Sequence, residues 1–177
     1  MLKKLAIAVG GLAAVVAVIF ALALMQPDTF TVTRTITIKA PPEKIIGLVT
    51  DFNQWKSWSP WEKLDPAMQR TITGAPNGKG SIYEWKGNSD VGAGRMEVLD
   101  VQPAAVQIKL DFLDPFESHN QTEFKFDKAG ESTTVTWTMT GPMLFASKVM
   151  SVFTSMDSMI GKDFEKGLAS MKQVAEK

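Results

Sequence analysis

The sequence predicts an α+β domain in which a curved antiparallel sheet packs against a long C-terminal helix. Three observations predict this class. Residues 29–40, TFTVTRTITIKA, alternate strictly, which is typical of a half-buried strand. Strand-like segments separated by turn residues follow from residue 68 to residue 140. Beyond Gly141-Pro142 the apolar residues recur every three or four positions, which indicates an amphipathic helix.

The elements are predicted in chain order. In the first strand threonines occupy one face and mostly apolar side chains the other. A short helix follows in PPEKIIGLVTD, where proline stands at the start. The C-terminal helix is expected to run unbroken from Phe145 to Val174, with lysines in its last turns. Together with the first strand, the sheet is expected to have about six to seven strands; the later ones are residues 68–73, 81–85, 95–102, 105–113, 119–127 and 132–140.

The first 25 residues differ from the remainder of the chain. Residues 5–25 carry no charge, and as a helix these 21 residues span roughly 32 Å, close to the ~30 Å hydrocarbon core of a bilayer. We therefore expect residues 1–25 to be a transmembrane anchor and residues 26–177 to form the domain. A cleaved signal peptide is the alternative, although the run exceeds the usual ~7–15 residues. Lys3 and Lys4 place the N-terminus in the cytoplasm and the domain outside it, or secreted after cleavage.

Three of the five tryptophans lie close together in NQWKSWSPWEKLDP, residues 53–66. Burial removes roughly 150–250 Å² of each indole from water, which corresponds to an upper bound of about 4–6 kcal/mol per residue. Trp55, Trp58 and Trp61 are therefore expected to be buried. They either close one end of the sheet as part of the core or line the mouth of a cavity.

Several segments follow one another in an order known from one superfamily: WSPWEKLDP, YEWKGN with VGAGRMEV, LDFLDPFE, TTVTWTMTG and MIGKDFEKGLASMK. Across about residues 30–175 the chain resembles the SRPBCC superfamily, with its START-type helix-grip fold, and most closely the polyketide cyclase/dehydrase-like branch. The resemblance implies a deep apolar cavity between the sheet and the long helix. In that family such cavities hold lipids, polyketides or other hydrophobic small molecules. Since fold does not fix function, the resemblance leaves the activity open.

Candidate ligand-binding residues follow from strand parity, helical spacing and the tryptophan cluster. Each apolar candidate has a plain core role as its alternative, and Arg34 is either a polar handle for a carboxylate or carbonyl or a residue that reaches solvent. Six of the ten methionines lie between residues 139 and 171, where flexible thioethers suit an adaptable surface. The candidates are Arg34, Trp55, Trp58, Trp61, Tyr83, Trp85, Phe112, Trp137, Met139, Phe145, Val149, Met150 and Phe153.

The sequence gives little support for catalysis, a metal site or a cofactor, and we predict none. There are no cysteines, and His119 is the only histidine. His119 stands in SHNQT, whose polar residues on both parities suggest an exposed edge. Asp51, Glu62 and Asp65 flank the tryptophans and are expected to be solvated or to cap helices, with an acid–base pair as the alternative. With 19 basic and 19 acidic residues, the charge does not point to nucleic acid.

Three functions remain open from the sequence. The first is a membrane-anchored module that binds a hydrophobic small molecule or lipid by burial in an apolar cavity. The second is an enzyme of the cyclase or dehydratase type, for which Arg34, Tyr83 and His119 are the available acid–base candidates. The third is a protein-interaction module whose cavity is filled by its own side chains.

Overall fold

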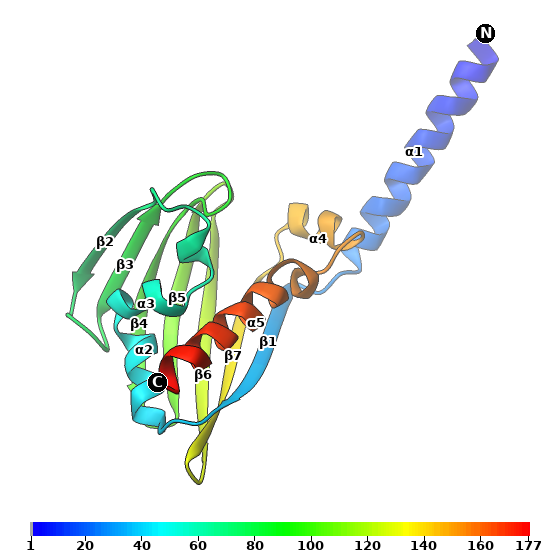
Figure 1. Ribbon diagram of the computed structural model, residues 1–177. Coiled ribbons are helices and arrows are strands. Elements are labelled where there is room, and N and C mark those ends of the chain that lie inside the picture. Colours follow the sequence, from blue (N-terminus) through cyan, green and yellow to red (C-terminus); the bar gives the residue numbers. More distant parts are fainter. Residues whose placement is uncertain (1) are drawn as a thin grey trace.

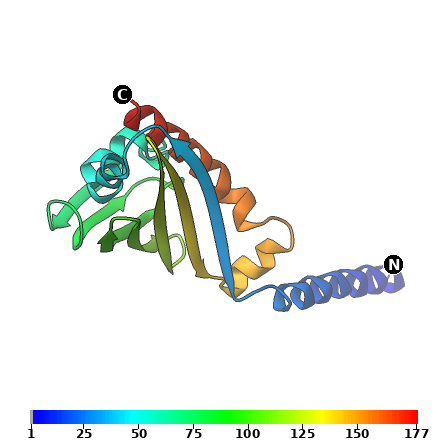
Figure 2. The same cartoon turned by 90° about the horizontal axis from the view of Figure 1, so that it is seen from below.

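The computed structural model describes residues 2–177 and has one seven-stranded antiparallel sheet, curved around a C-terminal helix (Figures 1 and 2). The strand order β1-β7-β6-β5-β4-β3-β2 places the first strand beside the last and leaves β1 and β2 at the edges. The predicted α+β class and sheet are therefore confirmed. The strands are β1 (Thr29–Ile38), β2 (Gln69–Gly74), β3 (Ser81–Lys86), β4 (Ala93–Gln102), β5 (Ala105–Asp114), β6 (Ser118–Ala129) and β7 (Ser132–Pro142).

Short helices connect β1 to β2 and close one end of the sheet (Figure 1). The first of them has proline in its first turn, where the missing N–H costs no hydrogen bond. Trp55 and Trp58 donate their indole N–H groups to the carbonyls of Val49 and Leu48, each at 2.9 Å. These carbonyls belong to the last turn of a helix, where they lack partners within the helix. The helices are α2 (Pro42–Thr50), η1 (Phe52–Gln54), α3 (Trp55–Trp58) and η2 (Trp61–Lys63).

The C-terminal region contains two helices, α4 (Phe145–Ser151) and α5 (Met156–Ala175), so the prediction of one unbroken helix is wrong. The break has a local cause. Ser155 has an extended backbone, and its hydroxyl accepts a hydrogen bond from the Ser158 N–H at 3.1 Å, which caps the start of α5. Helix α5 packs on β1 and α3, whereas Phe145, Met150 and Phe153 are exposed.

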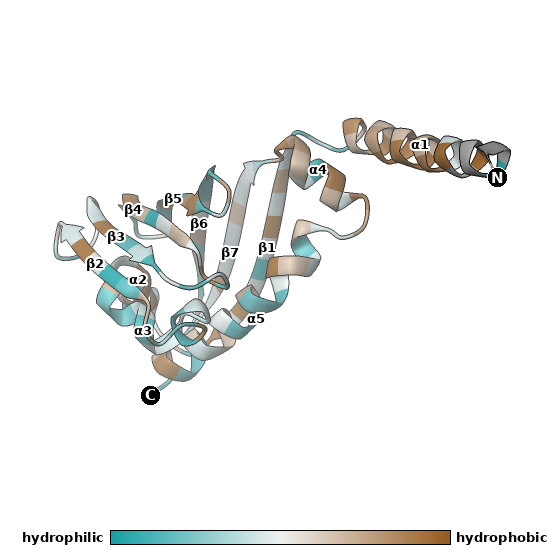
Figure 3. Cartoon of the chain, turned by 90° about the horizontal axis from the view of Figure 1, so that it is seen from above, coloured by the Kyte–Doolittle hydropathy of each residue, from teal (hydrophilic) through white to brown (hydrophobic). Residues whose placement is uncertain are grey.

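Helix α1 (Leu2–Leu24) extends away from the sheet, and its described side chains are predominantly hydrophobic (Figures 1 and 3). It contacts α4, where the rings of Phe20 and Phe145 stack at 5.4 Å. Met1, the first residue of the predicted anchor, lies outside the described residues. Within residues 2–177 no helix combines the length and apolarity needed to cross a bilayer, so the expected transmembrane helix is not confirmed.

The two faces of β1 have different chemistry, as its alternation predicts. The outer face carries threonines that pair with threonines of β7, as in Thr33–Thr138 and Thr35–Thr136, whose hydroxyl oxygens lie 3.1 Å apart. The inner face carries Val32 and other side chains that pack toward α5. This arrangement leaves the concave side of the sheet as the apolar interior of the protein.

Candidate functional site

A cavity of about 210 Å³ lies between the concave face of the sheet, the tryptophan segment (residues 53–66) and α5. The tryptophan segment forms a wall because Pro60 and Pro66 favour an irregular backbone there. Strand parity directs side chains of β3 to β7 inward, and α5 covers them. The lining residues are Trp55, Ser59, Trp61, Glu62, Met68, Tyr83, Trp85, Asp90, Val91, Met96, Leu110, Phe112, Thr122, Trp137, Met139, Ile160 and Phe164.

Stacked and edge-on aromatic rings form one wall of the cavity. Trp137 lies parallel to Phe164, with ring centroids 4.0 Å apart and an interplanar angle of 11°. Trp61 meets both rings edge-on, at 5.8 Å from Trp137 and 6.1 Å from Phe164. These packed rings form a rigid apolar surface, and edge-on contacts add about 0.5–1.5 kcal/mol each beyond area burial.

Glu62 and Tyr83 are the main polar side chains in the cavity wall, and Arg70 contacts Glu62 from outside the lining. The Tyr83 hydroxyl donates to Glu62 Oε1 at 2.6 Å, and Arg70 Nε lies 2.6 Å from Glu62 Oε2 as an ion pair. The Glu62 side chain is only 5% exposed, so its charge is balanced by Arg70 rather than by water. Burial, followed by the hydrogen bond to Glu62, raises the pKa of Tyr83 well above its ordinary value, and the phenol stays protonated.

The structure places seven of the predicted ligand-binding residues in the lining of this cavity. Some of these candidates lie on the strands and others in the tryptophan segment. Trp58 is fully buried behind the lining and does not line the cavity. The α4 candidates Phe145, Val149 and Met150, and Phe153 beyond that helix, line no described cavity. The seven are Trp55, Trp61, Tyr83, Trp85, Phe112, Trp137 and Met139.

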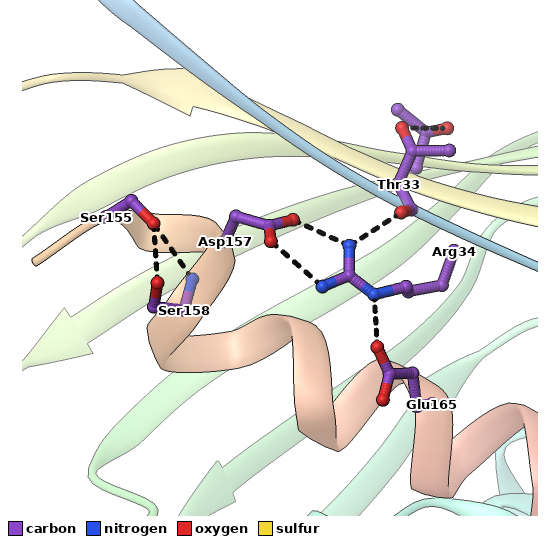
Figure 4. A network of polar contacts seen from close by, with 7 residues as sticks. Thr33, Arg34, Ser155, Asp157, Ser158 and Glu165 are labelled. Carbon is purple, nitrogen blue, oxygen red and sulfur yellow. Dashed lines mark hydrogen bonds and ion pairs between the residues drawn. The ribbon is translucent and has the colours of Figure 1, made fainter.

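Arg34 lies on the inner face of β1 as its parity predicts, and its acidic partners belong to α5, while its guanidinium also donates to the Thr33 carbonyl (Figure 4). Its guanidinium donates to Asp157 at 2.6 and 3.0 Å and to Glu165 at 2.7 Å. These hydrogen bonds raise the pKa of Arg34 and hold that of Asp157 below its usual range. Gly161 leaves room for this, since a Cβ there would lie 2.0 Å from an Arg34 nitrogen. In this structure Arg34 joins strand to helix and lines neither cavity.

Several lining residues were not among the sequence candidates. Met68 contributes from the residue before β2, Met96 from β4 and Leu110 from β5. Ile160 and Phe164 contribute from α5. For the strand residues, the alternation of apolar and polar positions in the sequence already indicates that their side chains face inward. The prediction that Glu62 is solvated is wrong, because its side chain is buried in the cavity wall.

A second cavity of about 160 Å³ adjoins the first at the end of the sheet nearest α4. Phe112 and Met139 line both cavities. The remaining lining comes from β1, from the β5–β6 turn, from β6 and from the segment that leads through α4 into α5. These residues are Phe30, Asp114, Pro115, Phe116, Ser118, Asn120, Pro142, Met143, Leu144, Ser147 and Met156.

His119 lies on the outer face of the sheet, away from both cavities. Its Nδ1 is 2.8 Å from Asp111 Oδ1, and Lys109 is 2.8 Å from the other oxygen. Burial raises the pKa of Asp111, but hydrogen bonds from Lys109 and His119 lower it more, so the net pKa is below the ordinary value. The prediction that His119 lies on an exposed edge strand is wrong, because β6 pairs with both β5 and β7 and lies inside the sheet. Among residues 2–177 no group of three or more His, Cys, Asp or Glu side chains is placed to hold a metal ion.

The curved sheet, the covering helix and the apolar cavity between them define a helix-grip protein of the SRPBCC superfamily. Residues 29–176 match the family described as "Polyketide cyclase / dehydrase and lipid transport", and the chain belongs to this family. The resemblance read from the sequence is thereby confirmed. No curated protein matches the chain in sequence.

Solved structures with this fold share little sequence with the chain. The Aha1 dimer from Colwellia psychrerythraea is 20% identical, with a TM-score of 0.59 over 83% of this chain and 96% of that one. Protein CV1439 from Chromobacterium violaceum is 13% identical, with a TM-score of 0.59 over 86% and 99%. The di-domain ARO/CYC BexL from the BE-7585A biosynthetic pathway is 15% identical, with a TM-score of 0.61 over 89% of this chain and 53% of that one. At these identities the likeness shows the fold alone.

Proposed function

We propose that this protein is a binding module that holds a hydrophobic small molecule or lipid in the cavity between the sheet and α5. The observation that carries the proposal is the cavity of about 210 Å³ whose lining is mainly aromatic and aliphatic. Such a cavity provides affinity through burial, and its rigid rings select shape. The family description, which includes lipid transport, supports the same class of ligand.

The polar groups in the cavity favour binding over chemistry. Glu62 Oε1 accepts the hydrogen bond of the Tyr83 hydroxyl, and Arg70 Nε lies 2.6 Å from Oε2 as an ion pair, so both oxygens face groups of the protein. A general base needs a free lone pair within hydrogen-bond reach of the substrate proton. In this arrangement Tyr83 and Glu62 orient one another, and their role is to give the wall a fixed polar position.

Binding can be tested on the full chain with N-phenyl-1-naphthylamine, a neutral dye whose fluorescence rises in apolar surroundings. We expect saturable binding that Trp61→Ala weakens about tenfold, equivalent to about 1.4 kcal/mol. Phe153→Ala is the matched control, because Phe153 is 72% exposed and lines neither cavity. Absence of saturable binding, or equal losses in the two variants, would refute the proposal. Native mass spectrometry of the same sample would identify any molecule that remains bound.

A second candidate function is catalysis of the cyclase or dehydratase type, and one observation favours it. Tyr83 and Glu62 form a 2.6 Å hydrogen bond at the cavity wall, and a substrate carbonyl oxygen that replaced Glu62 as the acceptor would be polarised by a hydrogen bond from the same phenol O–H. A linear poly-β-ketone thioester is the appropriate probe, with loss of water followed by mass spectrometry. Turnover that Tyr83→Phe abolishes, without loss of dye binding, would establish this function over simple binding.

The position of the protein relative to a membrane is a separate matter. The extracytoplasmic location inferred from Lys3 and Lys4 stays a prediction of the sequence. Neither the cavity nor the binding experiment depends on it.

A further inference from the structure

The two cavities share two lining residues. Phe112 of β5 and Met139 of β7 contribute to the lining of both cavities. Strand β6 runs between β5 and β7, so its inward side chains form the floor at this point. Methionine is flexible, and rotation of its side chain widens a passage without moving the backbone. The geometry therefore allows one ligand to occupy both spaces.

The inward-facing side chains of β6, which form the cavity floor, change from apolar to polar along the strand. Phe124, Thr122 and Asn120 alternate on the buried face, and the last two line the first and the second cavity respectively. Asn120 is only 4% exposed although it carries an amide. A buried amide is costly unless it is hydrogen-bonded, so its partners matter for what the second cavity can hold.

The hydrogen bonds of the Asn120 side-chain amide within the protein are all long. Its Nδ2 lies 3.4 Å from the carbonyls of Leu110 and Ser118, and its Oδ1 lies 3.3 Å from the Ser118 hydroxyl. Good hydrogen bonds of this kind are 2.7–3.2 Å long, so the amide retains capacity for a better partner. The Asn120 side chain fits at this place because residue 141 is glycine. A Cβ at residue 141 would lie 1.8 Å from Asn120 Oδ1.

The charged groups around both cavities restrict the ligand further. No lysine, arginine or histidine is among their lining residues, whereas Asp90 and Asp114 are. The charge of Glu62 is already matched by Arg70. A ligand carboxylate would find no cation there and would lose its hydration, so anionic molecules are disfavoured.

We propose that the two cavities form one continuous site for an elongated, neutral molecule, apolar over most of its length and hydroxylated at one end, with the hydroxyl on Asn120. This inference rests on the proposed function and specifies its ligand class. The apolar body occupies the aromatic first cavity, and the hydroxyl occupies the second. Phe112 and Met139 contact the middle of the molecule.

The test is displacement of N-phenyl-1-naphthylamine from the full chain by straight-chain primary alcohols, from octanol to dodecanol, and by the matching carboxylic acids. We expect affinity for the alcohols to rise roughly fourfold per added CH₂. The matching acids should bind at least tenfold more weakly at neutral pH.

Two variants localise the effect. Ser147→Phe places a ring in the second cavity and should weaken the longest alcohols most, while Ala146→Phe places the same ring on the exposed side of α4 and should change nothing. Asn120→Leu should weaken alcohols about fivefold, and Gln121→Leu, on the opposite face of the same strand, should not. Asn120→Leu keeps the test decisive if Ser147→Phe fails to fold.

The outcomes separate this inference from the proposed function. If the dye binds in a Trp61-dependent manner but acids bind as well as alcohols, or Asn120→Leu has no effect, the continuous site is refuted and the binding module stands. Failure of the dye to bind would overturn both. Equal effects of Ser147→Phe and Ala146→Phe would place the alcohols on an exposed apolar surface, which also refutes the inference.

Discussion

Trp58 and Trp61 lie three residues apart and are expected to respond differently to removal. Trp58 is fully buried, meets Trp137 and Phe124 edge-on, and donates its N–H to Leu48. Replacement of a buried Trp by Ala costs about 3–5 kcal/mol, and the unpaired carbonyl adds about 1–3 kcal/mol where water cannot reach it. For a protein of this size about 1 kcal/mol corresponds to roughly 2–4 °C, so Trp58→Ala should lower Tm by about 10 °C or more.

Trp61 is only partly buried and lines the cavity, so Trp61→Ala should mainly weaken ligand binding. The assay combines thermal unfolding by circular dichroism with dye titration at a temperature where both variants are folded. Trp58→Phe, which keeps a ring but removes the indole N–H, provides an intermediate if Trp58→Ala does not fold. A Trp58→Ala protein with unchanged Tm and lost binding would refute the assignment of Trp58 to the core.

Three further predictions follow from contacts elsewhere in the fold. Arg34→Met should lower Tm and leave dye affinity unchanged, and the difference from wild type should shrink at 1 M salt because its acidic partners are exposed. The pKa of Asp111 is lowered in the folded state, so ionised Asp111 stabilises the fold above its unfolded pKa near 3.8, and this contribution is lost as pH falls through the folded pKa. The stability of Asp111→Asn should therefore fall less steeply with decreasing pH than that of wild type. Gly94→Ala should cost about 1–3 kcal/mol, measured by urea unfolding, because its Cβ would lie 2.3 Å from the Trp85 ring. Gly47→Ala, whose Cβ meets nothing within 4 Å, is the control and should be neutral or stabilising.

Each of these three has a clear opposing result. Loss of dye binding in Arg34→Met would return Arg34 to the ligand site. Identical acid unfolding of wild type and Asp111→Asn would mean that the ion pairs of Asp111 do not contribute. A Gly94→Ala protein as stable as Gly47→Ala would show that Trp85 moves aside without cost.

The sequence predicts the sheet well because strand periodicity is a local property. The alternation of residues 29–40 and 132–140 gave both the strands and their inward faces, and β1 pairs with β7 across the length of both. The helix was predicted less well. The apolar spacing continues through residues 151–156, so the spacing alone does not show the break, although the Ser155 cap that causes it is local. The exposure of α4 depends on tertiary packing, which a local pattern does not report.

The candidate site was predicted in part for the same reason. Inward-facing aromatic residues such as Tyr83 and Trp137 were found because parity and residue type agreed. Glu62 and Asn120 were missed because charged and amide side chains are normally exposed. Burial of Glu62 depends on Arg70, and burial of Asn120 depends on Gly141, and neither partner is adjacent in sequence.

The measurement that tests the central claim most directly is a methyl NMR titration of the ¹³C-methionine-labelled full chain with decanol. Methionine methyl groups lie both in the cavity and away from it. If the molecule enters the cavity, Met68, Met96 and Met139 should shift in a saturable manner. Met171, a buried residue of α5 that does not line the cavity, and the exposed Met150 should not shift. Shifts confined to Met150 and other exposed methyl groups, or no saturable shift at all, would contradict the account.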